Sequence, residues 1–347
     1  MSNRLTNIDL LKIIASFMVV LLHINLMFIF NYKANDYEGI LLWILEFIAL
    51  PSVNIFALVS GYVFYDKKFK WERLIEIWII AFIYNFIFVL ISEQKNFSSL
   101  DIHFIIKLFT PIITQNFWYV SSYFSLMFFI PILNLGIQNE DKKTFLIFAV
   151  LSLVFFSIIS YYNKDIFNMA NGSSLIWLMI MYIIGAGIHK FNIEKEIQKK
   201  WLILLYILSL IFMEIYFLLS HMRINNYNLD FFSDAKYLAH NNPIIFSSSI
   251  LILLIFAKIK INNHFIIKII SFLSPLTLGI YMIHTSIVLI LQKVFNINIQ
   301  IILQNSNPIK LFIIIILFSI FIYLISAILD NIRKVIFDEV KKRIIKK

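Results

Sequence analysis

Residues 8–30 read IDLLKIIASFMVVLLHINLMFIF, an apolar run that carries two basic side chains, Lys12 and His23. A membrane-spanning helix needs about 20 predominantly apolar residues, so this run is long enough to cross a bilayer once. No small-residue cleavage site follows it, which indicates a helix of the mature protein and not a removed signal peptide. The opening of the chain therefore predicts an integral membrane protein.

Nine similar runs follow. Of 347 residues, 61% are hydrophobic and 14% charged, whereas soluble domains are about 45–50% apolar and about 25% charged. This composition excludes a water-soluble enzyme. We expect an all-α integral membrane protein, a polytopic bundle of about ten transmembrane helices, with residues 1–335 as the membrane domain and 336–347 as a basic cytoplasmic tail. The expected spans lie near 8–30, 40–65, 73–92, 116–137, 144–162, 173–189, 200–220, 240–258, 271–292 and 309–333.

Lysine and arginine are distributed unevenly between the two sides of such a bundle. With ten alternating spans, 21 of the 30 Lys and Arg residues fall on the side of the N-terminus and 8 on the opposite side, with Lys12 inside the first span. Cytoplasmic segments carry this excess, so both termini are expected in the cytoplasm. The net charge of +10 points to anionic lipids and not to nucleic acid. We expect a multi-pass protein of the cell (cytoplasmic) membrane.

Two connecting segments differ from short loops. Residues 97–113 are apolar but interrupted, which suits a re-entrant or interfacial helix on the outer side. Residues 221–240 form the longest polar stretch and also fall outside. Polar and aromatic outer segments suit a sugar-like ligand, and they equally suit ordinary exposed loops.

Ionisable side chains at membrane depth are few, and two of them share the first span. A charge at the centre of a bilayer costs at least about 2.5–3.5 kcal/mol, so each is a candidate functional group. Lys12 and His23 are separated by three helical turns plus about 20°, so they leave one face of the helix about 16.5 Å apart along its axis. Taken singly, Lys12 can reach cytoplasmic headgroups and His23 can bond another helix. Their shared face favours a joint function.

Two ionisable residues of other spans are expected at the depth of His23. They are Glu46 in the second span and His284 in the ninth. An imidazole beside a carboxylate is a common general base, so His23, Glu46 and His284 are the candidate catalytic residues. Two histidines and a carboxylate can also bind a divalent metal, but no span carries a close pair of histidines, and no metal is expected.

The cytoplasmic end of the second span carries groups that can bind an anion. Ser60, Gly61 and Tyr62 close this span, and a basic cluster that contains Arg73 follows. Gly61 allows another chain or a ligand to approach the backbone closely. The cations suit lipid phosphates, and the alternative is the phosphates of a nucleotide. An extended donor with its phosphates near Lys12 would need to reach His23 along the first helix.

Four motifs follow one another in the order of a known family. Asn7–Ile8–Asp9–Leu10–Leu11–Lys12, then ten residues, then His23 resemble its first-helix signature, in which Arg often replaces Lys12. Residues 54–62, NIFALVSGY, are similar to its Phe-x-x-x-Ser-Gly-Phe/Tyr segment, which precedes a basic cluster like that of Arg73. Phe117–Trp118–Tyr119 leading to Pro131, and residues 278–284, LGIYMIH, complete the set. The chain thus resembles the acyltransferase-3 family of integral-membrane acyltransferases, especially its short members that modify cell-surface glycans.

The resemblance implies transfer of an acyl group, commonly acetyl, from cytoplasmic acetyl-CoA or another short acyl-CoA. The implied acceptor is a hydroxyl of an extracytoplasmic cell-surface glycan or lipid-linked sugar. A thioester supplies a good leaving group, so a base worth about 10²–10⁴-fold suffices without a metal. The absence of cysteine leaves direct transfer or an acyl-Ser or acyl-His relay. The implied site residues are His23 as base, Lys12, Ser60, Gly61, Tyr62 and Arg73 at the donor, and Trp118 and Tyr119 at the acceptor.

Two other classes of function remain open from the residues alone. A transporter or exporter of a glycan or lipid-linked sugar would also place charges inside the membrane. Such proteins often contain repeated halves, and residues 1–170 and 171–347 show no convincing duplication. A non-catalytic scaffold or sensor would leave the spacing of Lys12 and His23 unexplained.

Overall fold

The computed structural model describes residues 5–33, 36–92, 102–113, 117–160, 165–224, 238–293 and 307–345. Within these ranges every regular element is a helix, which confirms the expected all-α fold. The longer helices are α1 (Thr6–Ile29), α2 (Tyr37–Ala49), α3 (Ser52–Phe64), α4 (Glu72–Ser92), α5 (Ile102–Phe109), α6 (Trp118–Asn139), α7 (Lys142–Leu151), α9 (Leu175–Lys190), α10 (Lys199–Ile224), α12 (Pro243–Ala257), α13 (His264–Leu273), α14 (Thr277–Lys293) and α16 (Pro308–Ile345). Four short elements complete the set: the π-helix η1 (Ser152–Ile159) and the 3-10 turns η2 (Ala170–Gly172), η3 (Ile193–Lys195) and η5 (Ser274–Leu276).

All ten apolar runs of the sequence fall on helices. Eight helical segments among the described residues are long and apolar enough to cross a membrane. The remaining two runs form α9 and α12, which have 16 and 15 residues and are shorter than the about 20 residues of a full crossing. The membrane class of the fold is therefore supported, whereas the number of ten crossings stays a prediction.

Proline interrupts two of the long apolar segments. Pro51 separates α2 from α3, and Pro275 lies in η5 between α13 and α14. Proline has no N–H to donate and its ring clashes with the carbonyl one turn earlier, so a helix bends or stops there. As a result α3 and α14 are short, separate helices, and both contribute residues to the cavity described below.

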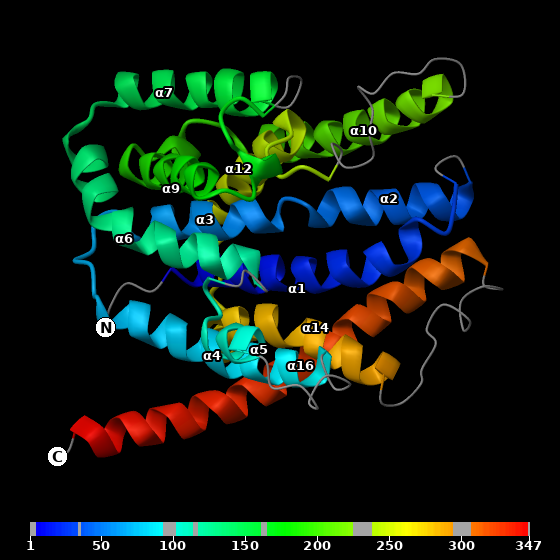
Figure 1. Ribbon diagram of the computed structural model, residues 1–347. Helices are drawn as coiled ribbons and strands as arrows, with labels where there is room; N and C mark the ends of the chain where they lie inside the picture. Colours follow the sequence, from blue (N-terminus) through cyan, green and yellow to red (C-terminus); the bar gives the residue numbers. More distant parts are fainter. Residues whose placement is uncertain are drawn as a thin grey trace.

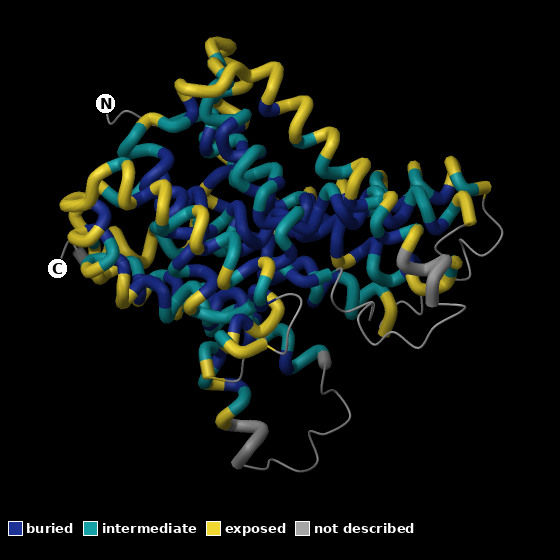
Figure 2. The backbone as a smooth tube through the Cα atoms, turned by 90° about the horizontal axis from the view of Figure 1, so that it is seen from above, coloured by how far each residue is buried: buried dark blue, intermediate teal, exposed yellow. Residues whose placement is uncertain are grey.

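Helix α1 is central to the bundle. It packs against α2, α3, α12, α14 and α16, and it runs between an upper group that contains α3, α9 and α12 and a lower group that contains α4, α14 and α16 (Figure 1). Buried residues gather in the middle of the molecule (Figure 2). Helix α1 begins and α16 ends at the same end of the bundle, on the left of Figure 1. The membrane side on which that end lies stays a prediction.

Helices α3 and α9 cross in very close contact, and two glycines make this possible. A Cβ at Gly61 would overlap the carbonyl oxygen of Tyr182 in α9, and a Cβ at Gly185 would overlap that of Leu58 in α3. Small residues at such crossings let helix backbones approach each other. The backbone of Gly61 is therefore approached by α9.

A buried ion pair within α16 contacts α4 and α14. Arg333 donates hydrogen bonds of 2.6 and 3.1 Å to the two oxygens of Asp330, and the Tyr84 hydroxyl donates one of 2.6 Å to Oδ1. Asp330 is fully buried. The carboxylate occupies the space that a side chain at Gly279 would fill, so this glycine lets α14 pack against α16.

The outward faces of several helices are apolar. Leu146 on α7, Phe212 on α10 and Leu317 on α16 are examples of large exposed hydrophobic side chains. A soluble protein rarely exposes large contiguous apolar patches, whereas lipid tails solvate such a surface. These faces agree with a protein whose helices lie in a membrane.

Two sequence boundaries can be compared with the structure. Helix α16 continues past residue 335 to Ile345 without a break, and Lys341 near its end forms an ion pair with Glu76 of α4. Within residues 97–113, α5 forms and packs against α4. Most of the 221–240 segment lies outside the described residues.

Candidate active site

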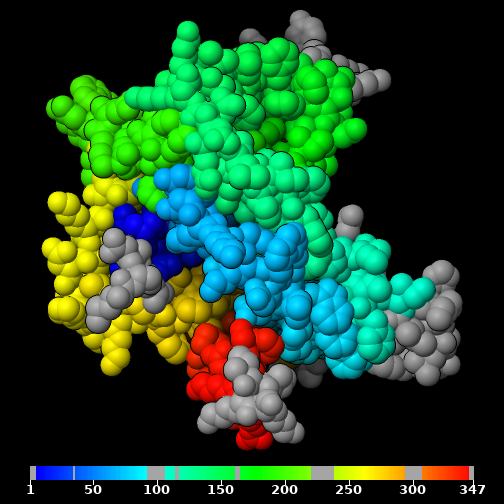
Figure 3. Space-filling model, turned by 90° about the vertical axis from the view of Figure 1, so that its left-hand side faces the viewer, coloured from blue at the N-terminus to red at the C-terminus, as the bar shows by residue number. Residues whose placement is uncertain are grey.

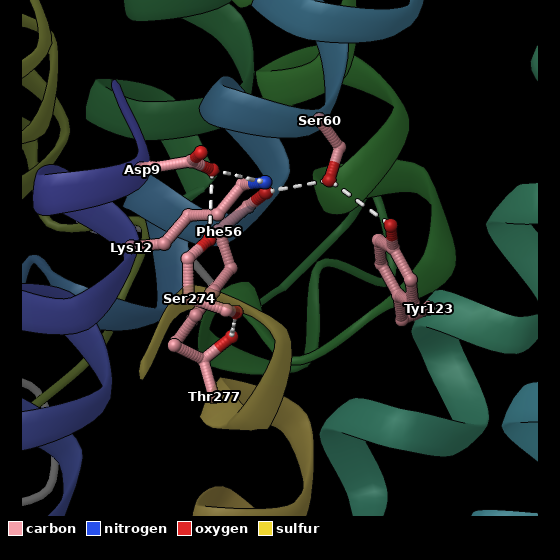
Figure 4. A network of polar contacts seen from close by, with 7 residues as sticks. All are labelled: Asp9, Lys12, Phe56, Ser60, Tyr123, Ser274 and Thr277. Atoms are coloured by element: carbon pink, nitrogen blue, oxygen red, sulfur yellow. Dashed lines mark hydrogen bonds and ion pairs between the residues drawn. The ribbon is translucent and has the colours of Figure 1, made fainter. Parts of the chain in front are cut away.

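Lys12 lies in the second turn of α1. The start of this helix is at the end of the bundle that faces the viewer in Figure 3. There the start of α1 (dark blue) is set between α13 (yellow) and the segment after α3 (light blue). The Lys12 ammonium lies 3.4 Å from Asp9 Oδ1, one turn earlier. Ser274 donates a 2.7 Å hydrogen bond to the same oxygen (Figure 4). The side chain is 25% exposed, so its charge is held in place at the edge of the bundle.

A cavity of about 200 Å³ lies beside Lys12. Its walls come from α1, α3, α4, α6, η5 and α14, and most of its lining is apolar or aromatic. Ligand pockets are commonly apolar with a few polar groups that fix orientation. The residues that matter below are Lys12, Ser60, Tyr119, Tyr123, Thr277 and Tyr281.

The polar groups of the cavity wall hold one another in position. Ser60 donates a 2.8 Å hydrogen bond to the Phe56 carbonyl, and its hydroxyl is 3.1 Å from that of Tyr123 (Figure 4). The Arg73 guanidinium lies 4.4 Å from the centre of the Phe64 ring. Because Phe64 lines the cavity, the cations of Lys12 and Arg73 border the same space.

Tyr119 of α6 and Tyr281 of α14 line the same cavity as Lys12. Their rings meet edge to face with centroids 5.7 Å apart. Tyr281 in turn lies 6.2 Å, centre to centre, from His284. Thr277, Tyr281 and His284 are spaced i, i+4 and i+7, so they share one face of α14. This face leads from the cavity to the histidine.

His284 lies against His23, as the depth of the two residues in their helices predicts. The rings meet at 63° with centroids 4.9 Å apart. His23 Nδ1 is 2.8 Å from the Val19 carbonyl oxygen. A carbonyl only accepts, so Nδ1 carries the proton and the lone pair of a neutral ring lies on Nε2. His23 is exposed while its neighbours Leu22 and Ile24 are buried, so this base is accessible.

The structure does not bring Glu46 to His23. Glu46 is fully buried, and its Oε2 accepts a 2.8 Å hydrogen bond from Asn25 Nδ2. Asn25 is two residues after His23, so its side chain leaves α1 about 200° further round the helix. The depth of His284 in its helix correctly predicted that it lies next to His23. Depth alone does not determine which face of α1 a residue of another helix contacts. Among the described residues, no carboxylate forms a hydrogen bond or ion pair with His23.

The predicted donor residues divide into two groups. Lys12 and Ser60 line the cavity, and Arg73 borders it. Gly61 and Tyr62 instead face α9, where the Tyr62 ring stacks on His189 with centroids 4.3 Å apart. The structure therefore brings three of these five residues together. Of the predicted acceptor residues, Tyr119 lines the cavity and Trp118 lies next to a further histidine.

That further histidine, His240, was not singled out from the sequence. The Trp118 ring stacks on it at 24° with centroids 5.6 Å apart. His240 precedes Asn242, whose side chain caps α12, and Pro243, the first residue of that helix. The Asn-Pro start of α12 is the one local sequence feature that could have indicated a fixed position for the residues just before it.

The histidines do not form a metal site with other ligands. Within the ranges that the structure describes, no three His, Cys, Asp or Glu side chains are grouped so that they could hold a metal ion. His23 and His284 are in contact, but the carboxylate that would complete a two-histidine site, Glu46, is hydrogen-bonded to Asn25 instead.

The helical bundle and the cavity beside Lys12, whose walls are mostly apolar and aromatic with a few polar groups, define the class of the protein as a membrane protein with a candidate ligand-binding site. The family model described as an acyltransferase domain matches residues 5–329, nearly the whole chain. The chain therefore belongs to the acyltransferase-3 family and is a membrane acyltransferase, which confirms the family resemblance of its motifs. No curated protein and no solved structure matched the chain.

Proposed function

We propose that the protein is an O-acyltransferase of the cell membrane. It moves an acyl group, by our proposal acetyl, from cytoplasmic acetyl-CoA to a hydroxyl of an extracytoplasmic cell-surface carbohydrate. The observation that carries this proposal is the column of residues between Lys12 and His23. Lys12 and Tyr281 line one cavity, and Tyr281 is followed on α14 by His284, which contacts His23.

The donor would bind with its phosphates at the cations and its thioester toward the histidines. Lys12 lines the cavity and Arg73 lies against Phe64 in its wall, and both supply positive charge for phosphates. Lysine offers a point charge where arginine would offer a bidentate contact. The apolar walls of the cavity suit the narrow arm of acetyl-CoA that joins its phosphates to its thioester. Lys12 and His23, where these two parts of the donor would lie, are about 16.5 Å apart along α1.

The histidine chemistry follows from the tautomer of His23. Nε2 accepts the proton of the attacking hydroxyl, and the hydroxyl oxygen forms a bond with the thioester carbonyl carbon. The carbon–sulfur bond then breaks, and the thiolate receives the proton from the imidazolium. The products are the ester and the free thiol. A positioned base of this kind contributes about 10²–10⁴-fold to the rate.

The acceptor would approach from the side of Trp118 and His240. The face of an aromatic ring packs well against the C–H face of a sugar, and Trp118 is half-buried beside the histidines. By our proposal, a hydroxyl of an acceptor bound there is the group that His23 deprotonates. The family assignment supports acyl transfer over glycan export. Acyl transfer breaks a thioester, whereas an exporter would leave it intact.

The test is acetyl transfer by the purified protein in proteoliposomes. Acetyl-CoA labelled in the acetyl group is the donor, and unacetylated cell-surface glycan is the acceptor. We expect transfer by the unchanged protein and a loss of about 10²-fold or more in His23→Ala. His264→Ala, which alters an exposed histidine at the start of α13, is the control. Full activity of His23→Ala would remove His23 from the mechanism.

A further inference from the structure

A second cavity, of about 280 Å³, lies between α6, α7 and α9. Among the described residues, it shares no lining residue with the cavity beside Lys12. Its described lining is apolar except for Glu140 and Thr144. Water does not fill an apolar cavity, and one of about 150 Å³ is large enough for a molecule such as benzene. This larger cavity therefore suits a longer hydrocarbon.

A glycine of α6 keeps this cavity open. A Cβ at Gly136 would meet nothing within 4 Å, so the backbone of α6 borders free space there. On the other side, Phe145 of α7 packs onto Gly187 of α9, where any Cβ would overlap the phenyl ring. Phe145 thus holds α7 against α9, while the missing side chain at Gly136 leaves a gap next to α6.

Hydrogen bonds hold α6 at its distance from α9. The Tyr182 hydroxyl donates a 2.7 Å bond to Asn134 Oδ1, and Asn134 Nδ2 donates one of 2.9 Å to the Phe64 carbonyl. About two turns further along α9, Lys190 donates a 2.7 Å bond to the Ile137 carbonyl at the end of α6. Because α6 is tied to α9 at two levels, it does not move inward to fill the cavity.

One end of the cavity is polar and carries both signs of charge. Glu140 and Thr144 lie there, where one candidate membrane span ends and the next begins. Lys190 donates a hydrogen bond to the Glu140 carbonyl, and its ammonium lies 4.7 Å from the centre of the Phe191 ring, which lines the cavity. A carboxylate and an ammonium thus stand together at the level where α6 and α7 leave the membrane.

The apolar part of the cavity runs from this end into the bilayer. Ile132, Gly136 and Glu140 line it at intervals of four residues, so they lie on one face of α6 and span about 12 Å. The hydrocarbon of one leaflet is about 15 Å deep. Ile132 is 67% exposed, so this face opens toward the surface that lipid tails cover. The cavity therefore has the orientation of a phospholipid in the surrounding leaflet.

We propose that this cavity is a phospholipid-binding site. One acyl chain lies along α6 from Glu140 to Ile132, and a zwitterionic headgroup lies over the polar end. Its ammonium meets the Glu140 carboxylate, and its phosphate is attracted by the charge of Lys190. An anionic headgroup without an ammonium is repelled by Glu140. The binding does not depend on the proposed acyl transfer, because the site is separate from the cavity beside Lys12.

Filling the cavity tests this site. The full chain is purified from membranes in a mild detergent, and bound phospholipid is measured by native mass spectrometry. Retention by Gly136→Phe should fall at least about tenfold, because the ring excludes two or more methylene groups and the burial of each contributes about fourfold to binding. Leu135→Phe is the matched control, since Leu135 is the neighbouring residue, is exposed and does not line the cavity. Equal retention by the two variants would overturn the proposal.

Photo-cross-linking tests the site in the unchanged protein, so it decides even if Gly136→Phe fails to fold. The full chain is placed in lipid nanodiscs with phosphatidylethanolamine that carries a diazirine on one acyl chain. Adducts should concentrate in residues 132–137 and 144–148. Unlabelled phosphatidylethanolamine should displace the probe about two- to fivefold better than phosphatidylglycerol, the size of an exposed charge contact. Adducts spread evenly over the outward faces of α7, α10 and α16, or equal displacement by the two lipids, would contradict the proposal.

Discussion

The imidazoles of His23 and His284 meet edge to face, with ring centroids 4.9 Å apart. This contact joins α1 to α14 at the level where the stripe Thr277, Tyr281 and His284 ends. Lys12, on the same face of α1 as His23, lines the cavity to which Thr277 and Tyr281 also contribute. Two helices that are distant in sequence therefore contribute residues to one series of contacts, which runs from the cavity of Lys12 through Tyr281 and His284 to His23.

Replacement of Lys12 tests the donor end of this path. In Lys12→Ala we expect the KM for acetyl-CoA to rise about 10- to 100-fold, because a hydrogen bond to a charged phosphate is worth about 1.5–3 kcal/mol. Lys12→Arg should retain donor binding, since the guanidinium keeps the charge. The measurement is initial rate against acetyl-CoA concentration at saturating acceptor.

Lys143→Ala is the matched control, because Lys143 is an exposed cation of α7 that does not line the cavity. An equal increase of the KM for acetyl-CoA in both variants would mean that the donor is attracted by the overall positive charge of the protein and makes no specific contact with Lys12.

Replacement of Gly61 tests the crossing of α3 and α9. A Cβ at this position overlaps the Tyr182 carbonyl, so Gly61→Ala should destabilise the protein by about 1–3 kcal/mol through overpacking. The measurement is thermal unfolding in detergent. Gly136→Ala in α6 is the control, since its Cβ would meet nothing within 4 Å, and it should be neutral or slightly stabilising. Equal stability of the two variants would contradict the close crossing.

Replacement of Asp330 tests the buried ion pair. Asp330→Asn leaves Arg333 without its charged partner inside the protein, and breaking such a pair costs about 3–5 kcal/mol. Asp338→Asn removes the partner of Lys334 at the exposed end of the same helix, where a surface pair is worth about 0–1 kcal/mol. Thermal unfolding should therefore separate the two variants clearly. Similar losses in both would show that the buried network does not join α16 to α4.

Cysteine labelling tests the topology, and the chain offers a clean background because it has no cysteine. Lys68→Cys and Ile197→Cys lie in segments that we expect in the cytoplasm, whereas Asp36→Cys lies in a segment that we expect outside. An impermeant thiol reagent added to intact cells should label only Asp36→Cys. Labelling of position 68 or 197 from outside would reverse the orientation.

Much of the fold could be predicted from the sequence, because bilayer thickness sets helix length and a fixed helical period sets which residues share a face. Both rules work on one helix at a time. They placed the ten helical runs, the shared face of Lys12 and His23, and the depth of His284.

The remaining contacts depend on how helices turn toward one another. The depth of a residue in the membrane does not show which side of α1 it contacts, so the hydrogen bond between Glu46 and Asn25 could not be predicted. Gly61 was read as open to a ligand or a chain, and only the crossing with α9 decides between them. His240 and Asp330 are joined to their partners across long sequence separations, which no local pattern reveals.

The most direct test of the path between Lys12 and His23 is the sidedness of the reaction. Sealed vesicles are loaded with labelled acetyl-CoA, and the glycan acceptor is added only outside. We expect ester to form on the external glycan with the unchanged protein and not with His23→Gln. Transfer that occurs only when donor and acceptor are present on the same side of the membrane would contradict the account.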